Sequence, residues 1–361
     1  MSKKQKFSAK LRRLRPYVLA AAIAAAAGII YPLLHGIFSF SLSLGAATLA
    51  CLITFGLVSF ETFVYEKKLR QMHIGKAIAA KTLVYSSVLA IAYLILNWVA
   101  QIKDPDHASS LSFQSLFIFA AVASVTVSSF VTVSHILGQH ELIRLILGHY
   151  HQPREEKRIL FFIDLAGSTT VAEKIGGVPF FNLLNDFFRD LTHPILAQGG
   201  EIYKYVGDEV IVSWPVKRRN GNARVLKCFF EIIEEVEQRK AFYEETYGVV
   251  PQFRAGAHMG TVVVGELGDF KKEIALMGDA VNTTARIISE AAYRGRGILI
   301  SQDLLNVISD SDRKGFLFDE LGKIPLKGKV TEVPLWGVSA LSNQQRPSWW
   351  DKLLKTSKKA A

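Results

Sequence analysis

The sequence predicts two fold classes in one chain: an α-helical transmembrane domain followed by an α/β domain. The first prediction rests on apolar residues, because half of the 361 residues are hydrophobic and the excess lies almost entirely before Leu137. The second rests on a change of pattern at Arg158, after which short strands alternate with helices. Charged residues make up 21 % of the chain, a low share for a protein that is soluble throughout.

Four apolar stretches in residues 17–136 are long enough to cross a bilayer as helices, which takes about 20 residues. They cover residues 17–35, 44–64, 77–100 and 111–133. Lysine and arginine gather in the N-terminal tail (1–16), in the second connection and after the fourth stretch. Because cytoplasmic loops carry the excess of positive charge, we expect a multi-pass protein of the inner (plasma) membrane. Both termini would face the cytoplasm, and the lipid bilayer would be a partner.

The placement of charge also argues against nucleic acid as a partner. The net charge is +11, but the lysines and arginines of the first half lie in the predicted cytoplasmic segments. The two cysteines, Cys51 and Cys228, belong to different predicted domains, so we expect no disulfide framework. Four histidines near the ends of the apolar stretches are interpreted as interfacial side chains, with haem ligation as the alternative: His35, His73, His107 and His135.

A connector (137–157) separates the two predicted domains. Leu142, Leu145 and Ile146 would share one face of a helix, along which two copies of the chain could pair. The alternative is that this helix is only the end of the fourth stretch. Pro153 then predicts the end of the helix, and a short charged hinge would follow. After the second domain (158–340), a basic tail (341–361) is predicted to be either disordered or bound to an anionic membrane surface.

The second domain reads as a regular succession of elements. An apolar strand ends at Asp164, and an amphipathic helix covers residues 182–196. Residues 201–214 read as a hairpin that turns at Gly207 and Asp208. A helix over 224–247, a strand pair over 253–268 and a helix over 280–292 follow.

Two carboxylates in this domain favour a metal site. Asp164 and Asp208 each follow an apolar strand and lie at a turn, where a side chain can leave the core and face a ligand. Such a pair suits one or two Mg²⁺ ions that carry phosphates. Directly after Asp164, Gly167, Ser168 and Thr169 open a helix, whose free N–H groups would face those phosphates.

Four segments resemble, in the right order, those of the class III adenylate and guanylate cyclases. FIDLAGST and YKYVGDEV resemble the two metal-binding motifs, FRAGAHMG resembles a strand of the family, and GDAVNTTAR resembles the transition-state motif. The resemblance spans residues 159–338. It implies an α+β, ferredoxin-like catalytic domain that converts ATP into cyclic AMP.

The resemblance also implies residue roles. Asp164, Asp208 and the backbone carbonyl of Ile163 would hold two ions, Mg²⁺ or Mn²⁺, in each site. Asn282 would orient the ribose, and Arg286 would stabilise the pentavalent phosphorus. Because these two residues are four apart, they share one face of a helix.

Lysines are implied at both ends of the nucleotide. Lys204 resembles the lysine that reads the adenine edge. The segment LKGKV resembles the loop whose lysine holds the terminal phosphates, and the spacing leaves Lys327 and Lys329 both open. One position departs from the family, because Ala275 stands where adenylate cyclases often carry an aspartate. An alanine makes no side-chain hydrogen bond, so base selection would depend on Lys204 and backbone groups.

In this family the metal aspartates and the asparagine–arginine pair of one site come from different chains. Since this sequence contains both sets, the resemblance implies a homodimer with two composite sites. Three alternatives are a guanylate cyclase of the same fold, a diguanylate cyclase of the GGDEF type, and a membrane receptor that binds nucleotide without catalysis. The GGDEF reading conflicts with Val206, which stands where that family has its first glycine.

Overall fold

The structure is a computed structural model that describes residues 152–218, 221–270, 272–329 and 331–341, with eight isolated helical residues between Ala26 and Ile91. The predicted membrane spans, most of the connector and the C-terminal tail therefore lie outside the described residues. Among those described, no helix is long and apolar enough to cross a membrane. Contacts within the chain define two compact units, and all residues from Tyr150 onward belong to one of them.

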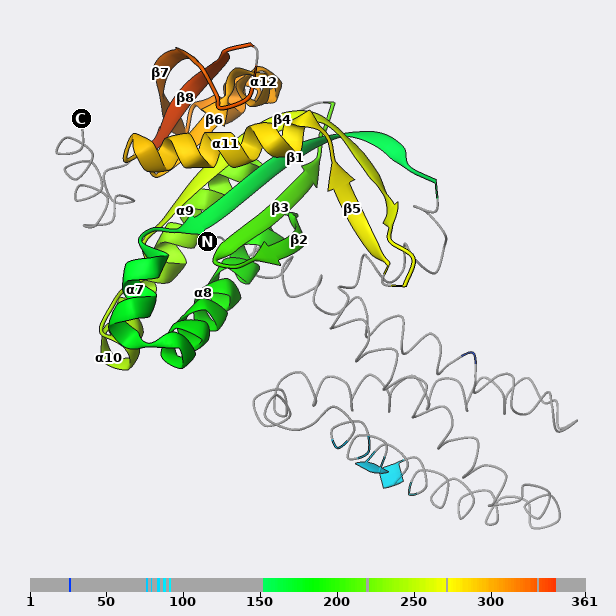
Figure 1. Cartoon of the computed structure of the whole chain (residues 1–361), viewed down its shortest axis with the longest axis vertical. Coiled ribbons are helices and arrows are strands. Elements are labelled where there is room, and N and C mark those ends of the chain that lie inside the picture. The colour runs from blue at the N-terminus through cyan, green and yellow to red at the C-terminus, as the bar shows by residue number, and fades with distance from the viewer. Residues whose placement is uncertain are drawn as a thin grey trace, which may run out of the picture. The chain divides into compact units, whose positions relative to one another are not determined.

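An eight-stranded sheet forms the centre of this unit (Figure 1). Its strands follow the order β2-β3-β1-β4-β6-β8-β7, and β5 pairs with β4 alone. All the paired strands run antiparallel except β4 and β6, which are parallel. The strand bounds are β1 Arg154–Leu165, β2 Glu201–Val206, β3 Glu209–Pro215, β4 Phe253–Leu267, β5 Glu273–Met277, β6 Ile298–Ser301, β7 Phe316–Ile324 and β8 Val333–Ala340.

Helices cover both faces of the sheet, and strand β1 shows why. Phe161 of β1 packs in one core cluster with Phe187, on the side of helices α8 and α9. The neighbouring residue Phe162 packs in a second cluster with Ile288 of helix α11, on the other side. A strand that is buried on both faces is apolar throughout, as this one is. The helix bounds are α7 Ser168–Ile175, α8 Gly177–Ala197, α9 Arg224–Gln238, α10 Lys240–Tyr247, α11 Asp279–Tyr293, α12 Gln302–Val307 and α13 Asp310–Arg313.

Two glycines of β4 let helix α11 approach the sheet closely. A Cβ atom added at Gly260 would lie 2.6 Å from Cβ of Ala280, and one added at Gly256 would lie 2.6 Å from the backbone nitrogen of Ile288. Both distances are far below van der Waals contact. The FRAGAHMG segment therefore supplies glycines for space, and they set the position of α11 on the sheet.

Several predicted elements are confirmed, and three are corrected. The hairpin with its turn at Gly207 and Asp208 and the helices over 182–196 and 280–292 are present. The predicted strand pair over 253–268 is instead a single strand, β4, because its β-branched run continues the ladder and β5 supplies the partner. The predicted helix over 224–247 is divided into α9 and α10 at Arg239, which pairs with Asp190 of α8.

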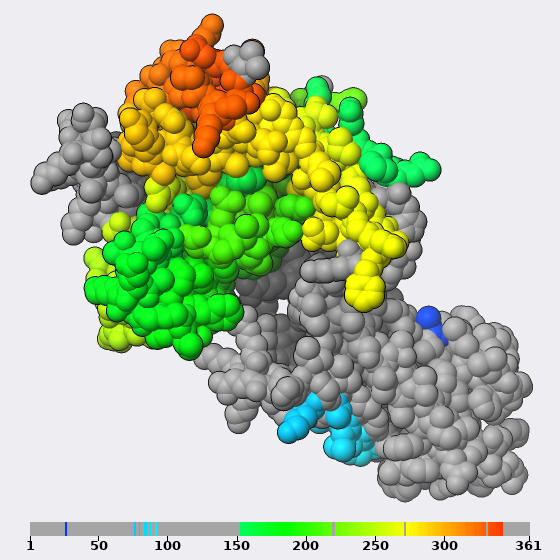
Figure 2. Space-filling model, in the orientation of Figure 1, coloured from blue at the N-terminus to red at the C-terminus, as the bar shows by residue number. Residues whose placement is uncertain are grey.

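The third correction concerns the predicted hinge before Arg158. Strand β1 begins at Arg154, and residues 154–157 pair with β4 from Val264 to Thr261. Charged side chains do not prevent this, because the backbone makes the ladder and these side chains lie at the surface. The second half of β4 and strand β5 extend from the rest of the sheet as an arm, drawn in yellow in Figures 1 and 2.

Candidate active site

Asp164 and Asp208 lie together at one edge of the sheet. Asp164 is near the end of β1, and Asp208 is in the turn between β2 and β3. Burial raises the pKa of Asp164 to about 6, and so do the negative charge of Asp208 and a hydrogen bond between the two side chains. The structure therefore brings these two carboxyl groups into contact, and their role as metal ligands stays a prediction.

The strand register produces this meeting. Strand β3 runs antiparallel to β1, with Glu209 directly opposite Asp164. The turn residue Asp208 precedes Glu209 and therefore lies at the same end of β1. Gly207 allows the tight turn, since its φ of 61° falls in the left-handed region that other residues rarely adopt.

Two further charged residues of this edge were not predicted. Glu209 and Arg254 flank Asp164 on the two neighbouring strands, so the three side chains form a row across β3, β1 and β4. Nε of Arg254 lies 3.6 Å from Oδ2 of Asp164. Burial, with the charges of Asp164 and Asp208, raises the pKa of Glu209 to about 7. The signal for Glu209 was available, because a two-residue turn at Gly207–Asp208 places it opposite the end of β1.

The donor set of this edge fits a hard divalent cation. Carboxylate oxygens are the ligands that Mg²⁺ and Mn²⁺ prefer, and Mg²⁺ usually takes one or two carboxylates, keeping its other positions for water and phosphate. Among the residues that the structure describes, no group of three or more His, Cys, Asp and Glu side chains is arranged to hold a metal. Two carboxylates are enough protein ligands for Mg²⁺, because water and phosphate oxygens fill its remaining coordination positions. The side chain of Ile163 is buried in the core, so only its backbone can contribute.

The segment after β1 turns directly into helix α7. Gly167 has φ 67° and ψ 29°, and no side chain caps the helix that begins at Ser168. Gly167 and Thr169 are exposed, and Ser168 is half-buried. The first turn of an uncapped helix presents N–H groups and the positive end of the helix dipole, which is the arrangement that binds phosphate.

Asn282 and Arg286 project from α11 on the side turned away from the sheet. Asn282 is exposed and Arg286 is half-buried, whereas the sheet-facing residues Ala280, Thr284 and Ile288 are buried. Nη1 of Arg286 is buried without a hydrogen-bond partner among the described residues. This nitrogen keeps an unused donor, which an anion could accept only if the neighbouring loop at Gly328 moved aside.

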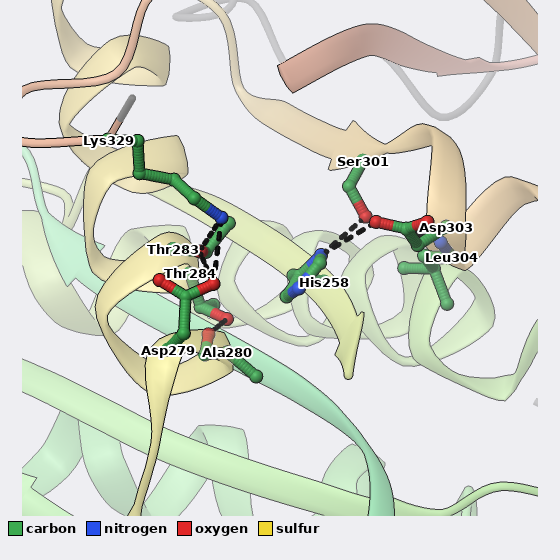
Figure 3. A network of polar contacts seen from close by, with 9 residues as sticks. All are labelled: His258, Asp279, Ala280, Thr283, Thr284, Ser301, Asp303, Leu304 and Lys329. Carbon is green, nitrogen blue, oxygen red and sulfur yellow. Dashed lines mark hydrogen bonds and ion pairs between the residues drawn. The ribbon is translucent and has the colours of Figure 1, made fainter. Parts of the chain in front are cut away.

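The structure distinguishes the two lysines that the sequence left open. Nζ of Lys329 lies 2.8 Å from Oδ2 of Asp279 and 2.8 Å from Oγ1 of Thr283, both on the first turns of α11 (Figure 3). Gly328 packs against the guanidinium of Arg286, since a Cβ there would lie 3.0 Å from Nη1. Lys327 is exposed. Lys329 is therefore the lysine that the fold places beside α11.

Comparison with known proteins identifies the family. The sequence pattern described as "Adenylate and Guanylate cyclase catalytic domain" matches residues 150–338, more than half of the chain. The chain belongs to this family. It is a cyclase, an enzyme of the phosphorus-oxygen lyase class.

The relatives of the cyclase include both adenylate and guanylate cyclases. It is 30 % identical to "Adenylate cyclase 2" of Rhizobium meliloti over 305 residues, which cover 81 % of this chain and 83 % of that protein. It is also 30 % identical to "Retinal guanylyl cyclase 2" of Rattus norvegicus over 49 % of this chain, but this match is only 16 % of that protein. A solved bacterial light-regulated adenylyl cyclase shares the fold, with a TM-score of 0.55, 22 % identity and coverage of 69 % of this chain and 70 % of that one.

Within one chain of the cyclase, the start of α11 lies away from the carboxylate edge along the sheet, and the helix runs back toward that edge as far as Ile288 over Gly256. Ala280 packs over Gly260, which is six residues along β4 from Arg254, the residue opposite Asp164. At about 3.3 Å per residue this separation is roughly 20 Å of strand. The side chain of Asn282 also points away from the sheet, so it does not meet the carboxylates of its own chain.

Lys204 of the cyclase lies on β2 and points toward β5. Its Nζ atom is 3.3 Å from both carboxylate oxygens of Glu273. Ala275 is buried with 8 % of its surface exposed, so it does not present a group to Lys204. The structure thus brings Lys204 to a carboxylate that the sequence had not indicated.

A second polar network of the cyclase supports the fold rather than the chemistry (Figure 3). Nδ1 of the buried His258 lies 2.8 Å from Oγ of Ser301, which also accepts a bond from the backbone of Leu304 at the start of α12. Asp303 is 3.9 Å from the same ring nitrogen. A hydrolytic triad needs its serine and aspartate on opposite ring nitrogens. Burial lowers the pKa of His258 to about 4, so the ring is neutral at pH 7.

Proposed function

We propose that this cyclase is a membrane-anchored adenylate cyclase, which converts ATP into 3′,5′-cyclic AMP and diphosphate for intracellular signalling. The observation that carries the proposal is the pair of carboxyl groups at the end of β1, where Asp208 raises the pKa of Asp164. A fold that holds two carboxylates together gains when a cation binds between them, and such pairs with shifted pKa values are concentrated at functional sites. The similarity to an adenylate cyclase covers 81 % of the chain and so extends beyond the cyclase domain itself.

One group of site residues would bind the metal ions and the phosphates of ATP. Asp164, Asp208 and the carbonyl of Ile163 would hold two Mg²⁺ or Mn²⁺ ions. Such ions favour ionisation of the 3′-hydroxyl and neutralise phosphate charge. The first turn of α7, with Gly167, Ser168 and Thr169, would donate N–H groups to the phosphates. Lys329 would hold the terminal phosphates, in exchange for its contacts with Asp279 and Thr283.

The reaction itself requires positioning and charge stabilisation. The ribose 3′-oxygen attacks the α-phosphorus, and diphosphate leaves as the bond to the β-phosphate oxygen breaks. Asn282 would orient the ribose for this in-line attack. Arg286 would donate to the oxygens of the α-phosphate, on which negative charge accumulates, with the Nη1 atom that has no partner in the described structure.

Two chains are needed for one complete site. The asparagine–arginine face of α11 points away from its own sheet, and the carboxylates lie roughly 20 Å along the strand from the start of that helix. A second copy in a head-to-tail arrangement would place Asn282 and Arg286 of one chain opposite Asp164 and Asp208 of the other. The proposed assembly is therefore a homodimer with two equivalent sites.

The test is product formation by the full-length chain in nanodiscs. With MnCl₂ and equal concentrations of ATP and GTP, we expect cyclic AMP as the main product by chromatography. Mainly cyclic GMP would identify a guanylate cyclase of the same fold, cyclic di-GMP would identify the GGDEF reaction, and no product would favour a receptor that only binds nucleotide. Membrane anchoring is tested separately by extraction of membranes with alkaline carbonate. An integral protein stays in the membrane pellet after this treatment.

A further inference from the structure

We infer that Glu273 reads the purine base together with Lys204, and supplies the carboxylate that Ala275 lacks. This inference rests on the proposed function, because it concerns the base of the same nucleotide. Glu273 lies outside the positions that the family resemblance indicated. It is placed there by the fold, 69 residues from Lys204 in the sequence and 3.3 Å from it in space.

The register of β5 makes Glu273 a natural substitute for a residue at position 275. Side chains two residues apart on a strand point to the same side, so Glu273 and Ala275 share one face of β5. A glutamate is also longer than an aspartate by one methylene group. Two residues of strand span about 7 Å, more than one methylene group covers, so Glu273 offers its carboxylate to the base from its own position, where it already contacts Lys204.

An irregularity of β2 directs Lys204 toward β5. The pairing of β2 with β3 shifts register between Ile202 and Lys204, as in a β-bulge. Bulges change the direction of side chains. Here two successive residues both reach β5: the Oη of Tyr203 accepts a hydrogen bond from the backbone of Leu276 at 3.0 Å, and Lys204 meets Glu273. The arm that contains β5 is visible in yellow at the surface in Figure 2.

The ion pair is open enough to accept a ligand. The side chains of Lys204 and Glu273 remain 46 % and 44 % exposed. Exposed ion pairs contribute little to stability, so they exchange partners readily. A base that approaches this pair would find the ammonium of Lys204 as a donor beside the carboxylate of Glu273 as an acceptor. Little free energy is needed to separate the two side chains.

The chemistry of the pair matches adenine in one orientation. The edge of adenine presents an acceptor at N1 and a donor at the 6-amino group, whereas guanine presents a donor at N1 and an acceptor at O6. Lys204 would donate to N1 of adenine, and Glu273 would accept from the 6-amino group. In that orientation guanine meets a donor with a donor and an acceptor with an acceptor. The order of the two charges along the edge therefore selects the base.

Exchanging the two residues tests this directly. In the double variant Lys204→Glu with Glu273→Lys, the ion pair is preserved but its order is reversed. We expect the preference for ATP over GTP to change to a preference for GTP. In the single variant Glu273→Met, we expect the ratio of kcat/KM for ATP to that for GTP to fall roughly tenfold or more. The ratio of kcat/KM for ATP to that for GTP is measured for each variant on full-length protein in nanodiscs. The ratio of the affinities for fluorescent ATP and GTP analogues is the second readout.

A matched control uses an ion pair elsewhere on the surface. Lys240 and Glu244 of α10 are also exposed, and exchanging them should change neither ratio. An unchanged ATP-to-GTP ratio in both Glu273 variants, with binding ratios unchanged as well, would overturn the inference and leave the adenylate cyclase proposal intact. If the wild-type protein forms no cyclic nucleotide, the proposed function fails instead. The binding ratios of the exchanged pair then still decide whether Glu273 contacts the base.

Discussion

Nε of Arg254 lies 3.6 Å from Oδ2 of Asp164, and no hydrogen bond satisfies this buried nitrogen among the described residues. The positive charge of Arg254 lowers the pKa of Asp164, but burial and Asp208 raise it by more. One guanidinium thus faces three acidic groups, because Glu209 belongs to the same row. The metal-free site therefore holds an excess of negative charge at neutral pH.

The first prediction concerns the pH dependence of stability without metal. The pKa of Asp164 is raised to about 6 from an ordinary value of 3.8, so the folded state holds its proton more tightly than the unfolded state does. The stabilising contribution is complete below about pH 4 and is lost as the pH rises through 6. In EDTA, the free energy of unfolding of the wild type should fall relative to Asp164→Asn by about 3 kcal/mol across this range. Urea unfolding at several pH values measures this difference. The same dependence of the free energy of unfolding on pH in the wild type and in Asp164→Asn would contradict the prediction.

The second prediction concerns the two carboxylates as metal ligands. Asp164→Ala and Asp208→Ala should each reduce metal-dependent turnover at least 100-fold, because either change removes half of the side-chain ligands. Circular dichroism should remain unchanged. The paramagnetic resonance signal of free Mn²⁺ provides a readout without catalysis, and both variants should bind less Mn²⁺. Asp310→Ala is the control, since that carboxylate is fully at the surface on α13. Wild-type turnover in either variant would end the metal assignment.

The third prediction concerns the composite site. Asp208→Ala and Arg286→Ala chains should each be inactive alone, because both sites of each homodimer lack a required group. A mixture should recover up to about one quarter of wild-type activity if dimers form at random, since half of the dimers are mixed and each has one intact site. Co-purification through two different tags confirms that mixed dimers form. Mixed dimers without activity would contradict a shared site.

The fourth prediction separates the two lysines of the late loop. Lys329→Ala should raise KM for ATP about tenfold or more, because it removes a charged contact to the terminal phosphates. Lys327→Ala is the matched control from the same loop and should leave KM within about twofold. Steady-state kinetics with saturating Mn²⁺ compares the two. A larger effect of Lys327→Ala would reverse the assignment.

The fifth prediction concerns the position of α11. Gly260→Ala introduces a methyl group 2.6 Å from Cβ of Ala280, so the helix must move away from the sheet. We expect a loss of about 1–3 kcal/mol in the free energy of unfolding. A lower kcat should accompany it, because α11 carries Asn282 and Arg286. Gly315→Ala is the control, since no atom lies within 4 Å of its added Cβ. An unchanged kcat would show that α11 tolerates the displacement.

Local pattern predicted much of the second domain. The apolar run that ends at Asp164 and the Gly207–Asp208 turn define their strands by composition and turn chemistry alone, and the register then brings both aspartates to one edge. The sequence could not reveal Arg254 or Glu273 in this way. Their roles depend on which strands are neighbours, and pairing between distant segments leaves no periodic signal in either one.

The errors have the same origin. The charged residues from Arg154 to Lys157 read as a hinge because their side chains are polar, but their backbone completes a ladder with β4. Arg239 divides the predicted helix 224–247 through contacts with another helix, which local propensity does not contain. The choice between Lys327 and Lys329 likewise required the position of Asp279.

Strand β1 runs for 12 residues without interruption from Arg154 to Leu165, and it is paired over most of that length on both sides. At about 3.3 Å per residue, it is a stiff rod of roughly 40 Å whose far end carries Asp164. No loop lies along it to absorb a pull or a twist applied at its beginning. A displacement of the backbone at Arg154 would therefore have a continuous, hydrogen-bonded path to the carboxylate edge.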